Sequence, residues 1–109
     1  MTEYHYETDN RKYFAKLGSL NKDLMGSFGA FNSKAFEEGA LSVKTKELIA
    51  VAAAHITRCP YCIAGHTRRA KQVGCTEQEI AEAIFVAVAM SAGASMAHSS
   101  IAMKALEEK

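Results

Sequence analysis

The stretch with the most reactive side chains is residues 59–66, which read CPYCIAGH. A thiolate is the reactive form of cysteine, and the unpaired N–H groups at a helix N-terminus stabilise its negative charge. Pro60 suits the first position of a helix, where its missing N–H would be unpaired anyway. Cys59 is then expected at the N-cap, with Cys62 in the same first turn. This spacing predicts a redox-active cysteine pair, although it also fits half of a zinc site or two unreactive cysteines.

His66 follows Cys62 by four residues, so the two side chains are expected on one helix face, one turn apart. An imidazole in that place can remove the proton of Cys62, which is what a cysteine nucleophile requires of an adjacent base. Taken alone, His66 fits equally well as a surface histidine that merely follows the pair.

Glu47 lies in the preceding helix, on the face that it shares with Val43, Val51 and Ala54. A carboxylate on so apolar a face is costly to bury unless a partner pairs with it. A short turn joins the two helices, so Glu47 could lie beside His66 and orient it or relay its proton. The alternative places Glu47 in an exposed first turn, where the helix dipole favours acids.

The elements before this site are expected to be helical. Residues 1–9 are polar and aperiodic and predict a poorly ordered or docking segment. A short helix is expected from Arg11 to Leu17, ended by Gly18. The next helix is expected to end at Gly39, and its apolar stripe consists of Leu24, Phe28, Phe31 and Ala35.

The helices around and after the site have clearer boundaries. Ser42 is expected to cap a helix over about 43–57, in which residues 48–56 are apolar on nearly all sides and therefore buried. The cysteine helix is expected to stop at Gly74. Thr76 and Glu79 form a capping box for another helix. Gly93 is expected to separate it from a last helix, whose core residues are Met96, Met103 and Leu106.

No stretch alternates in strand period, so the prediction is an all-α chain. Its 109 residues are expected to form one domain, a compact bundle of five or six helices with the Cys-x-x-Cys at a helix N-terminus. The almost wholly apolar helix over 43–56 is a large share of so short a chain. It favours an assembly in which subunits complete one another's burial.

Composition argues against several classes of function. The net charge of +1 gives no electrostatic reason for nucleic-acid binding, and the small basic patch 68–71 is interpreted as a solvated face. The longest uncharged run, 83–97, is shorter than the roughly 20 apolar residues of a membrane span. The N-terminus has no signal pattern, so a cytoplasmic location is expected. Three cysteines, an odd number, favour redox or metal chemistry over a disulfide framework.

Glu47, followed after eleven residues by Cys59-x-Tyr61-Cys62-x-x-x-His66, resembles the signature of the AhpD-like alkylhydroperoxidases of the carboxymuconolactone decarboxylase superfamily. The resemblance extends from about Phe28 to the C-terminus. It implies that the cysteines form a redox-active disulfide and that Glu47 and His66 relay a proton to Cys62. It also implies that Tyr61 assists and that Cys59 is the sulfur more accessible to a reductant. The best-characterised AhpD chains are longer two-repeat proteins with histidine at the position of Tyr61.

The predicted function is therefore a thiol-dependent alkyl hydroperoxidase, or disulfide oxidoreductase, of antioxidant defence. The resemblance implies an organic hydroperoxide as substrate and a lipoyl or thioredoxin-like dithiol as reductant, with no haem, flavin or metal. It also implies a homo-oligomer, either a trimer or a hexamer. The superfamily's lactone decarboxylases do not use this cysteine pair. The alternatives are such an enzyme of aromatic catabolism, a non-catalytic accessory protein, or a structural zinc site on Cys59, Cys62, His66 and Cys75.

The remaining candidates are interpreted as structural. Cys75, after Gly74, is expected to be a bystander, with surface mixed disulfides as the alternative. His55 and His98 are expected to be core or interface histidines. Five further side chains are expected in the core, some of them lining an apolar pocket over the thiols, namely Phe28, Phe31, Met90, Met96 and Met103.

Overall fold

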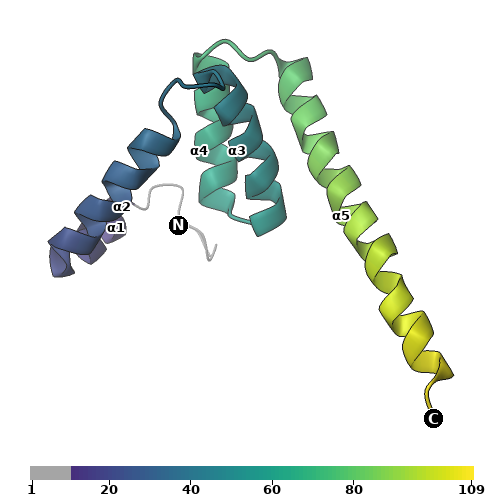
Figure 1. Ribbon diagram of the computed structural model, residues 1–109. Coiled ribbons are helices and arrows are strands. Elements are labelled where there is room, and N and C mark those ends of the chain that lie inside the picture. Colours follow the sequence, from purple (N-terminus) through teal and green to yellow (C-terminus); the bar gives the residue numbers. More distant parts are fainter. Residues whose placement is uncertain (1–10) are drawn as a thin grey trace, which may run out of the picture.

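The computed structural model describes residues 11–109, and all the regular structure among them is helical (Figure 1). The helices are α1 (Arg11–Leu20), α2 (Lys22–Ala35), α3 (Val43–Thr57), α4 (Pro60–Gln72) and α5 (Glu77–Glu107). The all-α prediction with five or six helices is thus confirmed for this part of the chain. The expectation for residues 1–9 lies outside the described residues.

Local hydrogen bonds fix both the start of α3 and the tight turn that joins α3 to α4. Ser42 caps the start of α3, where its hydroxyl accepts from the Thr45 N–H at 3.1 Å. Arg58 ends α3 in the left-handed region, at φ 59°, and the Cys59 N–H donates to the Ala54 carbonyl at 3.1 Å. Because only two residues separate the helices, α4 lies against α3 (Figure 1).

The start of α5 is fixed by the predicted capping box. The Thr76 hydroxyl accepts from the Glu79 N–H at 3.1 Å, and the Glu79 carboxylate accepts from the Thr76 N–H at 2.8 Å. The second carboxylate oxygen of Glu79 lies 3.2 Å from Lys44 Nζ, which ties α5 to the first turn of α3. Gly74, at φ +97°, adopts the left-handed backbone that ends the preceding helix.

The core lies where α3, α4 and the first turns of α5 meet. Val51 and Ala70 are fully buried and pack with the nearly buried Cys75. Leu48, Ile80 and Ile84 cover this centre. The core therefore fixes the two helices that carry the predicted site residues.

Three predicted helix ends differ from those of the structure. α1 runs through Gly18 to Leu20, where a Cβ at Gly18 would lie only 3.0 Å from Met25 Cγ. The glycine therefore permits close approach of α2 rather than ending α1. α2 ends at Ala35, before Gly39, and α5 passes Gly93 without a break. A single glycine costs a helix only about 1 kcal/mol, too little to interrupt the alanine-rich α5.

Two parts of the chain project from the core (Figure 1). α1 and α2 pack on each other and contact no other described helix, and residues 88–107 of α5 are all exposed. The prediction of core positions for Phe28, Phe31, Met90, Met96 and Met103 is therefore wrong within one chain, since each is more than half exposed. By length and composition alone, α5 is long and apolar enough to cross a membrane.

Candidate functional site

Cys59 and Cys62 lie at the N-terminus of α4, as their spacing predicts. Cys59 is the N-cap and Pro60 follows in the first turn. The two sulfur atoms lie 2.7 Å apart and share a hydrogen bond, and the Cys62 N–H donates to Cys59 Sγ at 3.2 Å. Both cysteines are free thiols and partly buried. Their side chains are close enough to react with each other when one of them is oxidised.

The surroundings separate the pKa values of the two thiols. Hydrogen bonds from the Cys62 thiol, the Cys62 N–H and the Tyr61 backbone lower the pKa of Cys59, against a smaller effect of burial. The pKa of Cys62 is raised by its hydrogen bond to Cys59, by burial and by the negative charge on Cys59. In the dithiol, the first negative charge therefore forms on Cys59, and Cys62 needs a base to become a thiolate.

Glu47 and His66 form a direct pair between α3 and α4. Glu47 Oε1 lies 2.7 Å from His66 Nδ1, and the glutamate is 2% exposed. The alternative of a solvated first-turn glutamate is therefore wrong. A carboxylate on Nδ1 selects the tautomer whose Nδ1 carries the proton, which leaves Nε2 as the basic nitrogen. Within residues 11–109, no hydrogen bond joins His66 to either sulfur.

Phe36 contributes to the site although the sequence interpretation did not include it. Its ring stacks on the His66 imidazole, with 5.1 Å between centroids and 14° between planes. Phe36 is the C-cap of α2 and is partly buried, whereas its neighbours in the chain are exposed. It lies outside the apolar stripe of α2. In the sequence, only its aromatic side chain and its position at the end of a helix indicated that Phe36 could contribute to the site.

The other predicted residues have structural surroundings. Tyr61 is partly buried in the first turn of α4. His55 donates from Nδ1 to the Val51 carbonyl at 2.7 Å, within its own helix, which agrees with a structural role. His98 is exposed on α5 and lies outside the core of this chain. Cys75 is 6% exposed, and burial raises the pKa of its thiol, which agrees with a bystander and counts against the alternative of surface mixed disulfides.

The zinc alternative has no support from the geometry. In the part of the chain that the structure describes, no three His, Cys, Asp or Glu side chains lie in an arrangement that could hold a metal ion. Cys75, its fourth proposed ligand, lies in the core with its sulfur 3.7 Å from the Lys44 carbonyl oxygen.

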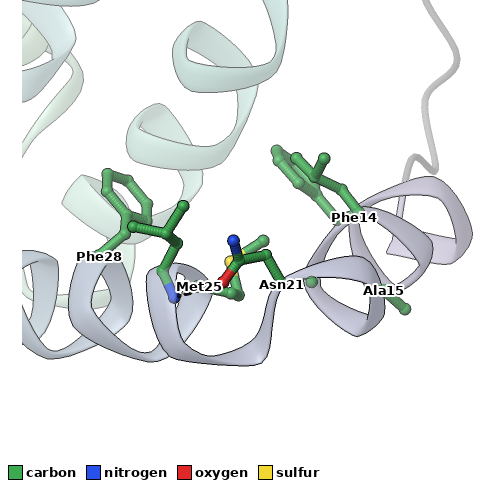
Figure 2. Close-up of a pocket in the computed structure, with 8 residues that line it drawn as sticks. Phe14, Ala15, Asn21, Met25 and Phe28 are labelled. Atoms are coloured by element: carbon green, nitrogen blue, oxygen red, sulfur yellow. Dashed lines mark hydrogen bonds between the residues drawn. The ribbon is translucent and has the colours of Figure 1, made fainter.

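An apolar cavity of about 890 Å³ lies between α1 and α2. Figure 2 shows Phe14 and Phe28 on its two sides, with Met25 and Asn21 between them. Phe28 lines this pocket, but the expectation of a pocket over the thiols is wrong for it. The pocket is formed by the two projecting helices and includes none of the predicted catalytic residues.

Comparisons with known proteins agree with this fold. A model of the carboxymuconolactone decarboxylase family matches residues 22–105. A Paracoccus denitrificans protein, named as uncharacterized protein 4 in the cox locus, is 49% identical over 100 residues, covering 89% of this chain and 90% of that protein. A solved carboxymuconolactone decarboxylase family protein from Legionella pneumophila is 35% identical, with a TM-score of 0.71 over 89% of this chain and 87% of that one. A Thermotoga maritima member, described as a candidate for the antioxidative response, is 34% identical, with a TM-score of 0.60 over 76% of this chain and 86% of that one.

Proposed function

The chain belongs to the carboxymuconolactone decarboxylase family, and we propose that it acts there as a thiol-dependent alkyl hydroperoxidase of the AhpD-like type. One observation carries the proposal. The buried carboxylate of Glu47 pairs with the partly buried imidazole of His66, which lies one helical turn from a cysteine pair at a helix N-terminus. The Thermotoga maritima relative is described as a candidate for the antioxidative response, which supports the same proposal.

The relay has a specific task in this proposal because the pKa of Cys62 is raised. His66, held at Nδ1 by Glu47, takes the Cys62 proton at Nε2. The Cys62 thiolate attacks the terminal oxygen of an organic hydroperoxide, so that the O–O bond breaks and an S–O bond forms. His66 returns the proton to the leaving alkoxide, which departs as the alcohol. Positioned acid–base catalysis of this kind contributes about 10²- to 10⁴-fold in rate.

The second half of the cycle uses Cys59. Its lowered pKa favours the thiolate form of Cys59 over that of Cys62, and its sulfur is already beside that of Cys62. Attack of Cys59 on the Cys62 sulfenic acid forms the disulfide and releases hydroxide, which leaves as water once protonated. An external dithiol of lipoyl or thioredoxin-like type then attacks Cys59. Cys62 leaves as the thiolate, and the relay can protonate it. The second thiol of the donor then attacks the donor sulfur of the mixed disulfide, so that Cys59 leaves as a thiolate and the donor becomes a disulfide.

The experiment is turnover of cumene hydroperoxide with a dithiol as electron donor. Cys59→Ser and Cys62→Ser are each expected to abolish turnover. Intact-mass analysis of the unaltered protein should show a loss of two hydrogens after peroxide, at Cys59 and Cys62, which a reductant restores. Turnover that persisted in the double variant would show this mechanism to be wrong.

The family name itself favours a second candidate, a lactone decarboxylase-like enzyme of aromatic catabolism. Such an enzyme would not need the cysteine pair. Substrate screening of the protein with both thiols alkylated separates the two functions, because only the decarboxylase predicts activity that survives alkylation.

A further inference from the structure

The segment 36–42 connects α2 to α3, and Phe36 is its first residue (Figure 1). None of its residues belongs to a helix or a strand. α1 and α2 contact no other described helix, so helix packing within residues 11–109 does not fix the position of Phe36. The contacts of the segment itself must therefore hold the Phe36 ring on the His66 imidazole.

The backbone around Phe36 is hydrogen-bonded to two different helices. The N–H groups of Phe36 and Glu37 each donate to a carbonyl of α2 at 3.2 Å, which ties both residues to α2. The carbonyl of Glu37 accepts a hydrogen bond from Nζ of Lys46, a residue of α3. Lys46 therefore links the backbone beside Phe36 to the helix that carries Glu47.

Lys46 lies next to the segment at two points. Besides its bond to Glu37, its Nζ would lie 3.9 Å from a Cβ built at Gly39. The positive charge also suits this place, because Glu37 follows the C-terminus of α2, where the helix dipole favours a cation. The later part of the segment has a contact of its own, since Glu38 Oε1 accepts from the Val43 N–H at 3.4 Å.

Lys46 and Glu47 are adjacent in α3, and each holds one ring of the stack. Glu47 Oε1 lies 2.7 Å from His66 Nδ1, and Lys46 binds the carbonyl beside Phe36. The two rings are nearly parallel, with 14° between their planes. One turn of α3 thus places both partners of a contact that joins α4 to the end of α2.

We propose that Lys46 is a positioning residue of the site and acts through Phe36 on the orientation of His66. The inference rests on the proposed function, in which Nε2 of His66 takes the proton of Cys62. Glu47 restrains the imidazole at one atom, so the ring can still tilt about that contact. A ring packed on its face removes this freedom. Small displacements of a catalytic group are costly, since about 1 Å can lower a rate about 100-fold.

The stack also favours the charged state that the relay must form. His66 becomes a cation while it holds the Cys62 proton. A cation within about 6 Å of the centre of an aromatic ring is attracted to the face of that ring, and the centroids of Phe36 and His66 lie 5.1 Å apart. The ring of Phe36 also keeps water from one face of the imidazole, which strengthens the attraction between His66 and Glu47.

Lys44, two residues earlier, provides the comparison with an ordinary surface lysine. Its Nζ lies 3.2 Å from Glu79, and both side chains are about 40% exposed, at 43% and 39%. Ion pairs of this kind contribute little to stability. Lys44 and Lys46 thus belong to the same turn and carry the same charge, but only Lys46 binds the segment that carries Phe36.

The experiment is Lys46→Met, which keeps the length of the side chain and a good helix former but removes the donor. The ring-current shift of Phe36 on the His66 ring protons should decrease in the NMR spectrum. Single-turnover oxidation by cumene hydroperoxide should slow by about 2- to 10-fold. Lys46→Arg keeps a donor and should retain both the shift and the rate. Lys44→Met, the matched control, should leave both unchanged.

A double variant shows whether Lys46 acts through Phe36. In the Phe36→Leu background, Lys46→Met should cause no further fall in the rate, because residues that act through one contact are not additive. A further fall as large as that in the unaltered protein would overturn the proposal. So would an unchanged ring-current shift in Lys46→Met, or a lost shift with an unchanged rate. The NMR measurement needs no peroxidase activity, so an inactive protein would refute the proposed function and still allow the contact of Lys46 to be tested.

Discussion

Glu47 and His66, nineteen residues apart in the chain, meet with 2.7 Å between Oε1 and Nδ1 in a place where the glutamate is 2% exposed. A buried carboxylate without a partner costs several kcal/mol, so the pair is a condition for this packing of α3 on α4. The same contact fixes which imidazole nitrogen can accept a proton. One pair therefore serves both the fold and the proposed chemistry.

Glu47→Gln is the first test of the relay. Glutamine keeps the shape and can still hydrogen-bond to the imidazole, but it cannot stabilise a protonated ring by charge. We expect a loss of about 100-fold in the rate of peroxide reduction, with the far-UV circular dichroism spectrum unchanged. The measurement is single-turnover oxidation followed by thiol titration. Glu47→Asp, which keeps the charge, is the control and should retain more activity than Glu47→Gln.

The opposite pKa shifts of the two thiols predict an order of alkylation. Since the pKa of Cys59 is lowered and that of Cys62 is raised, Cys59 is the first to become a thiolate as pH increases. Iodoacetamide followed by peptide mapping should therefore label Cys59 at lower pH than Cys62. In Cys59→Ser the charge on Cys59 is absent, so Cys62 should react at lower pH than in the unaltered protein. Labelling of Cys62 first would contradict this arrangement of hydrogen bonds.

Local signals in the sequence were sufficient to predict the helices at the centre of the fold. Ser42, Pro60 and the Thr76–Glu79 capping box each satisfy backbone groups within a few residues, so the start of each helix can be predicted from neighbours alone. The spacing of Cys59, Cys62 and His66 along one helix is local in the same sense. Glu47 could be added to the predicted site only because a short turn brings its helix back beside the helix that carries the cysteines.

Long-range packing could not be predicted in the same way. Phe36 meets His66 across thirty positions of the chain, and no periodic pattern marks that contact. The apolar stripe of α2 was recognised, but a stripe does not say whether its partner lies in the same chain. Phe28 and Phe31 belong to this stripe and are exposed here. Periodicity thus identifies the apolar face, and the accessible area shows that the face is unpartnered.

Arg58 offers a test of the turn that leads into the cysteine pair. A non-glycine residue in the left-handed region costs about 1–2 kcal/mol, and Arg58 has φ 59°. Glycine removes this cost but makes the unfolded chain more flexible, which offsets part of the gain. We expect Arg58→Gly to raise the free energy of unfolding by about 0.5–1 kcal/mol in urea titrations. Thr57→Gly, at the last residue of α3, is the matched control and should lower it, because glycine is the poorer helix former.

Cys75 should be needed for packing but not for redox chemistry. Its side chain is buried against Val51 and Ala70, and burial raises the pKa of its thiol. Cys75→Ala should lower the free energy of unfolding by about 1 kcal/mol, as for the loss of a small buried side chain. Intact-mass analysis should still show reversible formation of the Cys59–Cys62 disulfide. A failure of that disulfide in a folded variant would mean that Cys75 belongs to the site.

Phe36 is the residue through which the position of α1 and α2 can affect the site. Stacked aromatic rings contribute about 0.5–1.5 kcal/mol beyond the area that they bury, and Phe36 covers one face of the His66 ring. Phe36→Leu keeps an apolar side chain but removes the stack, so the imidazole should sample more orientations. We expect the rate of peroxide reduction to fall by about 2- to 10-fold, without a change in the number of titratable thiols. The spectroscopic signature is loss of the ring-current shift on the His66 ring protons in the NMR spectrum. Phe31→Leu, on the exposed face of the same helix, is the matched control and should leave those resonances in place. If both variants shift the His66 resonances equally, the effect arises from α2 as a whole and not from the stack.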